Sequence, residues 1–220
     1  MVGAMETPGR KPALASDPPL GRSFYARATD EVARDLIGRV LVHDSPEGLT
    51  AGRIVETEAY LGPGDPASHA HRGPTPRSKI MFGHPGVAYV YFAYGMYHLL
   101  NAVTEDHGKA GAVLIRALAP VQGQELMRTR HAAWRASRSR KPPAHTRETD
   151  LANGPGKLTI AMGIDLAQNG QDLTGGELFI TRGEPVADLA VTVSPRIGIR
   201  QGTEHELRFF VKGDPHVSKG

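Results

Sequence analysis

The stretch YVYFAYGMYHLLNAV, residues 89–103, contains four of the six tyrosines of the chain. Aromatic and β-branched residues favour strands, and Gly95 interrupts them near the middle. The pattern therefore predicts a β-hairpin with its tip at residues 93–95.

Tyr94 lies at the predicted tip, where its ring has little of its own fold to pack against. A protruding ring on a rigid hairpin is suited to entering a stack of bases. Tyr89 and Tyr97 lie within the strands, and for them ordinary packing in the sheet is an equally good interpretation.

The composition limits the classes of protein that this chain can belong to. Its 220 residues are enough for a hydrophobic core, and no apolar run approaches 18 residues, so no membrane span is expected. The absence of cysteine excludes disulfides, cysteine nucleophiles and the zinc base deaminases, and it fits a reducing compartment.

The first residues differ in composition from the rest of the chain. Residues 1–19 are rich in Pro, Ala, Gly and Ser and lack the apolar segment of a secretory signal. We expect a disordered N-terminal lead and a protein that is not secreted.

Alternating and helical patterns predict a mixed set of elements after this lead. Residues 21–37 are expected to start extended and to become an amphipathic helix with Thr29 as its N-cap. A strand over residues 110–118 is expected to be stopped by Ala119 and Pro120. The other predicted strands are 39–44, 49–60, 177–182, 186–187, 191–193 and 207–211, and the other predicted helices lie in 122–135 and 153–164.

Two acids two residues apart, Glu56 and Glu58, share one face of the 49–60 strand with Ile54 and Tyr60. Either acid could act as a general base on water, and a nearby Arg116 would keep it ionised. Each could also be half of a structural ion pair, and the pattern alone does not choose between them.

His69 and His71 form an H-x-H pair in the loop 61–85, which allows the hypothesis of a metal hydrolase using a strand glutamate. No third ligand has an obvious spacing, and a loop histidine is more often a hydrogen-bonding residue. No metal site is therefore predicted.

Residues 121–150 contain seven Lys or Arg against three Asp or Glu, although the net charge of the chain is only +3. The basic loop within them fits contact with phosphates, and it equally fits a solvated surface. A glycine-rich turn before Lys157 is a second place that could attract an anion. These features allow a DNA- or RNA-binding module without catalysis.

The motifs taken together resemble one family, the 3-methyladenine (alkyladenine) DNA glycosylases. The similarity spans residues 20–218, which would be the glycosylase domain, and its blocks follow the order of that family. The blocks are RIVETEAYLGP (53–63), 67–69, 75–77, 81–82, YVYFAYGMY (89–97), Asn101, LIRAL (114–118), GPGKL (154–158) and LRFFVKG (207–213).

The resemblance implies a monofunctional enzyme that starts base excision repair. It would flip an alkylated or deaminated purine out of double-stranded DNA, such as 3-methyladenine, 7-methylguanine, hypoxanthine or ethenoadenine. It would then hydrolyse the N-glycosidic bond without a cofactor, and the sequence does not rank these substrates.

The resemblance also implies roles for particular residues. Glu58 would activate water with the help of Arg116, Glu56 would be structural, and Tyr94 would fill the gap left by the flipped nucleotide. Tyr60, His69 and Tyr91 would sandwich the base, and Asn101 would exclude guanine. Further DNA contacts are expected from Met96, Tyr97, Thr75, Arg77, Met81 and Lys157.

The fold implied is a single α/β (α+β) domain with a curved, mainly antiparallel sheet, packed helices and a projecting β-hairpin. It is similar to the C-terminal domain of methionyl-tRNA formyltransferase. A monomer is expected, in the cytoplasm near the nucleoid of a bacterium or in the nucleus of a eukaryote. His71, His98, residues 135–150 and the N-terminal lead have no assigned role.

Overall fold

The structure is a computed structural model that describes residues 17–138, 146–184 and 186–219. Most of the expected N-terminal lead and the centre of the basic loop lie outside the described residues.

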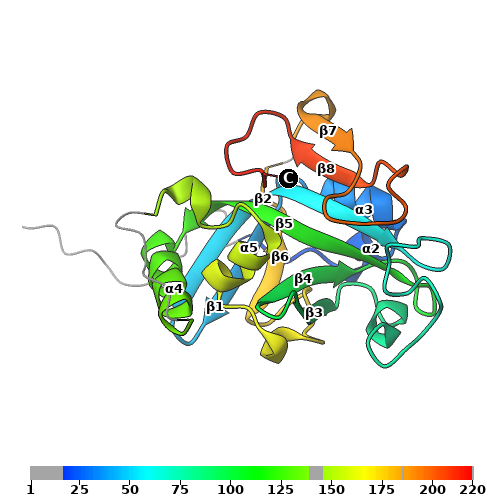
Figure 1. Cartoon of the computed structure of the whole chain (residues 1–220), viewed down its shortest axis with the longest axis horizontal. Helices are drawn as coiled ribbons and strands as arrows, with labels where there is room; N and C mark the ends of the chain where they lie inside the picture. Colours follow the sequence, from blue (N-terminus) through cyan, green and yellow to red (C-terminus); the bar gives the residue numbers. More distant parts are fainter. Residues whose placement is uncertain (1–16, 139–145, 185, 220) are drawn as a thin grey trace, which may run out of the picture.

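A curled antiparallel sheet of eight strands forms the centre of the molecule (Figure 1). The order along it is β3-β4-β5-β2-β1-β6, and β8 pairs with both β2 and β7. This arrangement confirms the predicted class, a single mixed α/β domain built on a curved antiparallel sheet. The strands are β1 Val40–Ser45, β2 Gly48–Leu61, β3 Ala88–Ala93, β4 Tyr97–Val103, β5 Gly111–Gln122, β6 Leu178–Thr181, β7 Val191–Ser194 and β8 Arg208–Val211.

Helices pack against this sheet and complete the core. The helix α3 contacts β2 and β5, whereas α5 contacts β4 and α4. Among the described residues no helix is both long enough and apolar enough to cross a membrane. The helices are α2 Arg22–Tyr25, α3 Thr29–Asp35, α4 Gln124–Ala136 and α5 Pro155–Met162, with short 3₁₀ turns η1 Lys79–Phe82, η2 Glu148–Asp150, η3 Leu166–Gln168 and η4 Asp188–Ala190.

The N-terminal helical segment differs from its prediction in two ways. Residues 22–25 form the short helix α2 where an extended chain was expected. The N-cap of α3 is Ala28, and the Thr29 hydroxyl instead bonds the side chains of Thr104 and Glu105. The capping prediction was wrong because this threonine satisfies a long-range partner.

Two strand predictions also fail. β5 continues through Pro120 to Gln122, because at this point β2 is its paired neighbour while β4 pairs with β5 only at residues 112–114. A proline without an N–H is tolerated where one side of the strand carries no ladder. Residues 186–187 form no strand.

The pairing of β2 with β5 is irregular where the candidate acids lie. The register shifts between Ile54 and Glu56, and again between Glu56 and Thr57, so that Val55 and Arg116 are each left without a facing partner. β-Bulges of this kind re-aim side chains and are common beside active sites. The period-two face that was expected to begin at Ile54 is interrupted here.

Candidate active site

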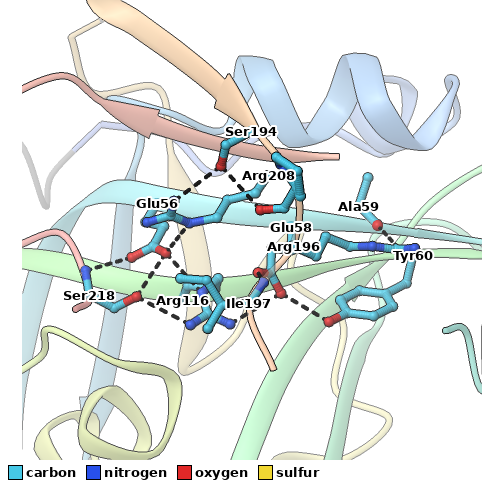
Figure 2. Close-up of polar contacts among 11 residues, drawn as sticks. Glu56, Glu58, Ala59, Tyr60, Arg116, Ser194, Arg196, Ile197, Arg208 and Ser218 are labelled. Carbon is cyan, nitrogen blue, oxygen red and sulfur yellow. Dashed lines mark hydrogen bonds and ion pairs between the residues drawn. The ribbon is translucent and has the colours of Figure 1, made fainter. Parts of the chain in front are cut away.

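Glu58 is fully buried at the centre of a polar cluster (Figure 2). Its Oε2 accepts a hydrogen bond from the Tyr60 hydroxyl at 2.9 Å and another from Nη1 of Arg116 at 3.1 Å. Its Oε1 accepts one from the backbone N–H of Ile197 at 2.7 Å. Because a carboxylate has roughly four acceptor sites, these contacts within the described chain leave one for water.

Glu56 lies on the same face of β2 but is enclosed by a different set of donors. Its Oε1 accepts from Nε of Arg116 at 2.9 Å, from Nε of Arg208 at 2.7 Å and from the Ser218 hydroxyl at 2.8 Å. Its Oε2 accepts from the Ser218 N–H at 2.7 Å. Among the described residues, three of these four contacts fall on Oε1 and one on Oε2, so the carboxylate is anchored within the network.

Arg116 joins the two acids, because it sits at the bulge of β5 and its guanidinium turns toward both (Figure 2). Burial opposes its charge, but the carboxylates of Glu58 and Glu56 more than compensate and raise the pKa of Arg116. Its positive charge is therefore permanent. Arg116 is thus paired with two carboxylates, those of Glu56 and Glu58.

Tyr60 is held on the other side of Glu58 by Arg196. The guanidinium of Arg196 lies 4.8 Å from the centre of the Tyr60 ring and forms two hydrogen bonds with Asp65, at 2.6 and 2.8 Å. Burial and the neighbouring Glu58 carboxylate raise the pKa of Tyr60 above its ordinary value. Its hydroxyl therefore stays protonated and donates to Glu58.

Three aromatic rings form a wall beside this cluster. His69 packs edge-on against Tyr91 with ring centres 4.7 Å apart, and its Nδ1 lies 2.9 Å from the hydroxyl of Tyr89. Arg77 lies 4.8 Å from the centre of the Tyr91 ring. Loss of hydration and the charge of Arg77 lower the pKa of His69 to about 4, so the imidazole is neutral near pH 7.

A cavity of about 320 Å³ opens between these groups. Its lining includes the three partners that hydrogen-bond Glu58 in the described part of the chain, namely Tyr60, Arg116 and Ile197, together with His69 and Tyr91. The buried carboxylate thus lies directly behind the wall of an open pocket. A volume of this size suits a small planar ligand.

A smaller cavity of about 30 Å³ continues behind the aromatic wall. Asn101 lines it and donates from Nδ2 to the backbone oxygen of Tyr89 at 3.1 Å. Met81 lines it as well and is only 1% exposed. Met81 was expected to contact DNA, which needs an exposed side chain. In the structure Met81 is buried and forms part of the pocket wall.

Tyr94 also lines the larger cavity, from the tip of the β3–β4 hairpin. The Met96 N–H bonds the Ala93 oxygen at 3.1 Å, which closes a tight turn whose central residues, Tyr94 and Gly95, have φ of 54° and 67°. The predicted hairpin and its tip are confirmed. The ring of Tyr94 is 76% exposed.

The other predicted contact residues lie outside the lining of the cavity that Tyr94 lines. Thr75 and Arg77 are exposed on the loop that precedes η1, and Lys157 is exposed on α5, where its Nζ donates to Asn153 at 2.8 Å. Tyr97 stacks on Trp134 with ring centres 5.2 Å apart, and Met96 is half-buried beside it.

Sequence reasoning missed four residues of the cluster: Arg196, Ile197, Arg208 and Ser218. They lie 131 to 162 positions away from the acids they contact, which are Asp65 for Arg196, Glu58 for Ile197 and Glu56 for the other two. Arg208 lies within a block already noted, next to two phenylalanines, but nothing local marks the N–H of Ile197 or the hydroxyl of Ser218.

The H-x-H pair does not gather further ligands. Across residues 17–138, 146–184 and 186–219, no group of three or more His, Asp or Glu side chains is arranged to hold a metal ion.

Comparison with known proteins gives a consistent family. A family model described as methylpurine-DNA glycosylase (MPG) matches residues 23–215. A protein of Carboxydothermus hydrogenoformans is 49% identical over 201 residues, which cover 91% of this chain and 98% of the relative. One of Methanocella arvoryzae is 48% identical over 206 residues, covering 92% and 96% of the two chains. Both are named "Putative 3-methyladenine DNA glycosylase".

The family model covers most of the described chain and includes every residue of the cluster except Ser218. Matches of this length and identity show common descent rather than a shared short motif. They favour an enzyme over a nucleic-acid-binding module without catalysis. This chain belongs to the methylpurine-DNA glycosylase family of DNA repair enzymes.

Proposed function

We propose that the protein is a monofunctional glycosylase that removes alkylated or deaminated purines from double-stranded DNA and so starts base excision repair. The substrates would be of the 3-methyladenine, 7-methylguanine, hypoxanthine and ethenoadenine class. The observation that carries this proposal is a buried carboxylate, Glu58, whose three partners line an aromatic pocket.

The pocket is suited to a flipped purine that carries a positive charge. The rings of Tyr60, His69 and Tyr91 would lie against the base, and an aromatic face attracts a cation by about 0.5–2 kcal/mol. Because the low pKa of His69 keeps the imidazole neutral, it adds no repulsion. Asn101 lines the cavity behind these rings and would crowd the exocyclic amine of guanine.

Hydrolysis needs one proton acceptor when the leaving base is already cationic. Water held at the free acceptor site of Glu58 gives up a proton to the carboxylate, and its oxygen forms a bond to C1′ of the sugar. The C1′–N bond breaks, and its electron pair neutralises the departing purine. The carboxylate also stabilises the positive charge that develops on the sugar, since it lies in a water-poor site.

Extrusion of the nucleotide leaves a gap that Tyr94 is placed to fill. Its exposed ring projects from a tight turn at the rim of the pocket. Unstacking a base costs on the order of a few kcal/mol, and an inserted ring recovers part of this. The flanking DNA backbone would be contacted by Met96 and Tyr97 of the hairpin itself and by Thr75, Arg77 and Lys157 from other segments.

We further propose that one chain acts alone, because a lesion of a single base needs no symmetric partner. It would act where the chromosome lies, in the cytoplasm around the nucleoid of a bacterium or in the nucleus of a eukaryote.

The direct test is the isosteric substitution Glu58→Gln in the full chain. It removes the proton acceptor and keeps the shape, so release of free 3-methyladenine from duplex DNA should fall by at least ~100-fold. Binding to the same duplex, followed by fluorescence anisotropy, should persist. Glu125→Gln is the matched control, since Glu125 lies exposed on α4 far along the chain. Full base release by Glu58→Gln would refute the mechanism.

A further inference from the structure

The last described residues return to the centre of the molecule. Residues 214–218, here called the C-terminal strap, follow β8 and are tied down at both ends. Asp214 pairs with Arg53 at 3.3 Å, and Val217 packs on the small cluster that contains Val55 and Ala117. The strap therefore covers the two bulges that place the acids and the arginine.

Ser218 is the last residue of the strap. It is buried and hydrogen-bonds two charged residues of the network, Glu56 and Arg116 (Figure 2). Its N–H and hydroxyl donate to the two oxygens of Glu56, at 2.7 and 2.8 Å. Its hydroxyl oxygen also accepts from Nη2 of Arg116 at 3.2 Å.

These contacts decide how Arg116 meets Glu58. Glu56 takes the Nε of the guanidinium and Ser218 takes Nη2, so a single nitrogen, Nη1, is left to reach Glu58. A guanidinium that was free to turn would offer two nitrogens to one carboxylate, as arginine prefers. That arrangement would use the acceptor site that the mechanism needs for water.

We propose that the C-terminal strap is part of the catalytic apparatus and that Ser218 is a positioning residue, which holds Arg116 to one contact with Glu58. This inference rests on the proposed role of Glu58 as the proton acceptor. It assigns a function to a segment that lies beyond the last recognised sequence block.

Several charged or ionisable groups face Glu58 from the surrounding elements. They are Tyr60 on β2, Arg116 on β5, Tyr91 on β3, Arg196 in the loop after β7, and Arg208 on β8, which is the cross-strand neighbour of Glu58. Within the described part of the chain, Ser218 hydrogen-bonds one member of this set, Arg116. Loss of its hydroxyl therefore acts on Glu58 through that guanidinium.

The substitution Ser218→Ala tests the proposal, because the backbone N–H that anchors Glu56 remains. Nη2 would lose its acceptor and turn toward Glu58, whose negative charge would then be held more firmly. Single-turnover release of 7-methylguanine from duplex DNA should fall by roughly 10- to 100-fold at its plateau. The acid-side midpoint of the pH–rate profile should move to lower pH.

Two variants complete the experiment. Ser218→Thr keeps the hydroxyl and should retain the wild-type midpoint. Lys219→Ala, at the exposed neighbouring position, should leave the whole profile unchanged.

The outcomes separate this proposal from the proposed function. A Ser218→Ala profile that matches wild type, or one lowered equally at every pH with an unmoved midpoint, would overturn the positioning role. Either result is compatible with an inactive Glu58→Gln, so the role of Glu58 would stand. An active Glu58→Gln would instead remove the basis of both.

Discussion

At the scale of single residues, Tyr94 combines an unfavourable backbone with an exposed ring. Its φ of 54° lies in the left-handed region, which costs a residue with a Cβ about 1 kcal/mol or more. A tight turn with two positive φ angles is better served by Asn followed by Gly. The chain keeps a tyrosine at a position where its ring contributes little to folding, which is the pattern expected of a residue retained for function.

Replacing Tyr94 should separate stability from activity. Tyr94→Asn should raise the free energy of unfolding by up to about 1 kcal/mol, because asparagine tolerates this conformation. Base release from duplex DNA should fall, while release from single strands changes less. Urea unfolding and single-turnover assays measure the two effects, and Tyr94→Phe, which keeps both strain and ring, is the control. A less stable but fully active Tyr94→Asn would contradict this account.

At the scale of elements, the hairpin depends on the helix beneath it. The Tyr97 ring, at the start of β4, is sandwiched between Gly156 of α5 and the indole of Trp134 on α4. A Cβ built on Gly156 would lie 2.5 Å from Cγ of Tyr97. The glycine therefore allows α5 and the hairpin to pack in direct contact.

Gly156→Ala should destabilise the protein even though it improves helix propensity. The gain in propensity is about 1 kcal/mol, whereas forcing the trapped ring aside costs about 1–3 kcal/mol, so the clash should win. Thermal unfolding would measure the loss. Trp134, the single tryptophan of the chain, should report the displaced ring by its fluorescence.

The matched control is Gly154→Ala, two residues earlier, where an added Cβ meets nothing within 4 Å. Equal melting temperatures for the two variants would show that the contact between Gly156 and Tyr97 does not constrain the hairpin.

At the scale of the whole molecule, a buried histidine, His131, links the free energy of unfolding to pH. His131 on α4 is buried and bonds the Leu151 backbone oxygen at 2.7 Å. Burial lowers the pKa of His131, so the unfolded chain takes up a proton at a higher pH than the folded chain does. Its contribution to stability is therefore present above the unfolded value of about 6.5 and is lost as the pH falls below it.

The free energy of unfolding should decrease between pH 7 and pH 5, by at most about 1.4 kcal/mol per pH unit for this one group. Urea unfolding at several pH values measures the slope. His131→Gln can still donate to Leu151 but does not titrate, and it should show a shallower slope. An identical slope in this variant would mean that other groups carry the pH dependence.

The sequence by itself determined the elements whose pattern is local. The tyrosine hairpin follows from strand-forming residues around Gly95, β2 from its alternation, and α4 from its helical period. The order of motifs also pointed to the family, which the comparisons show. Local rules failed at Thr29 and Pro120, where a distant hydroxyl partner and a missing neighbouring strand were decisive.

Only the tertiary structure decided how the two acids differ. Glu56 and Glu58 share one face of one strand, so their spacing could not separate them. Partners from β8 and the C-terminal strap anchor Glu56, whereas the loop after β7 gives Glu58 a backbone N–H and leaves it beside the pocket. Such contacts join residues more than 130 positions apart, and periodicity, which acts over a few residues, carries no information about them.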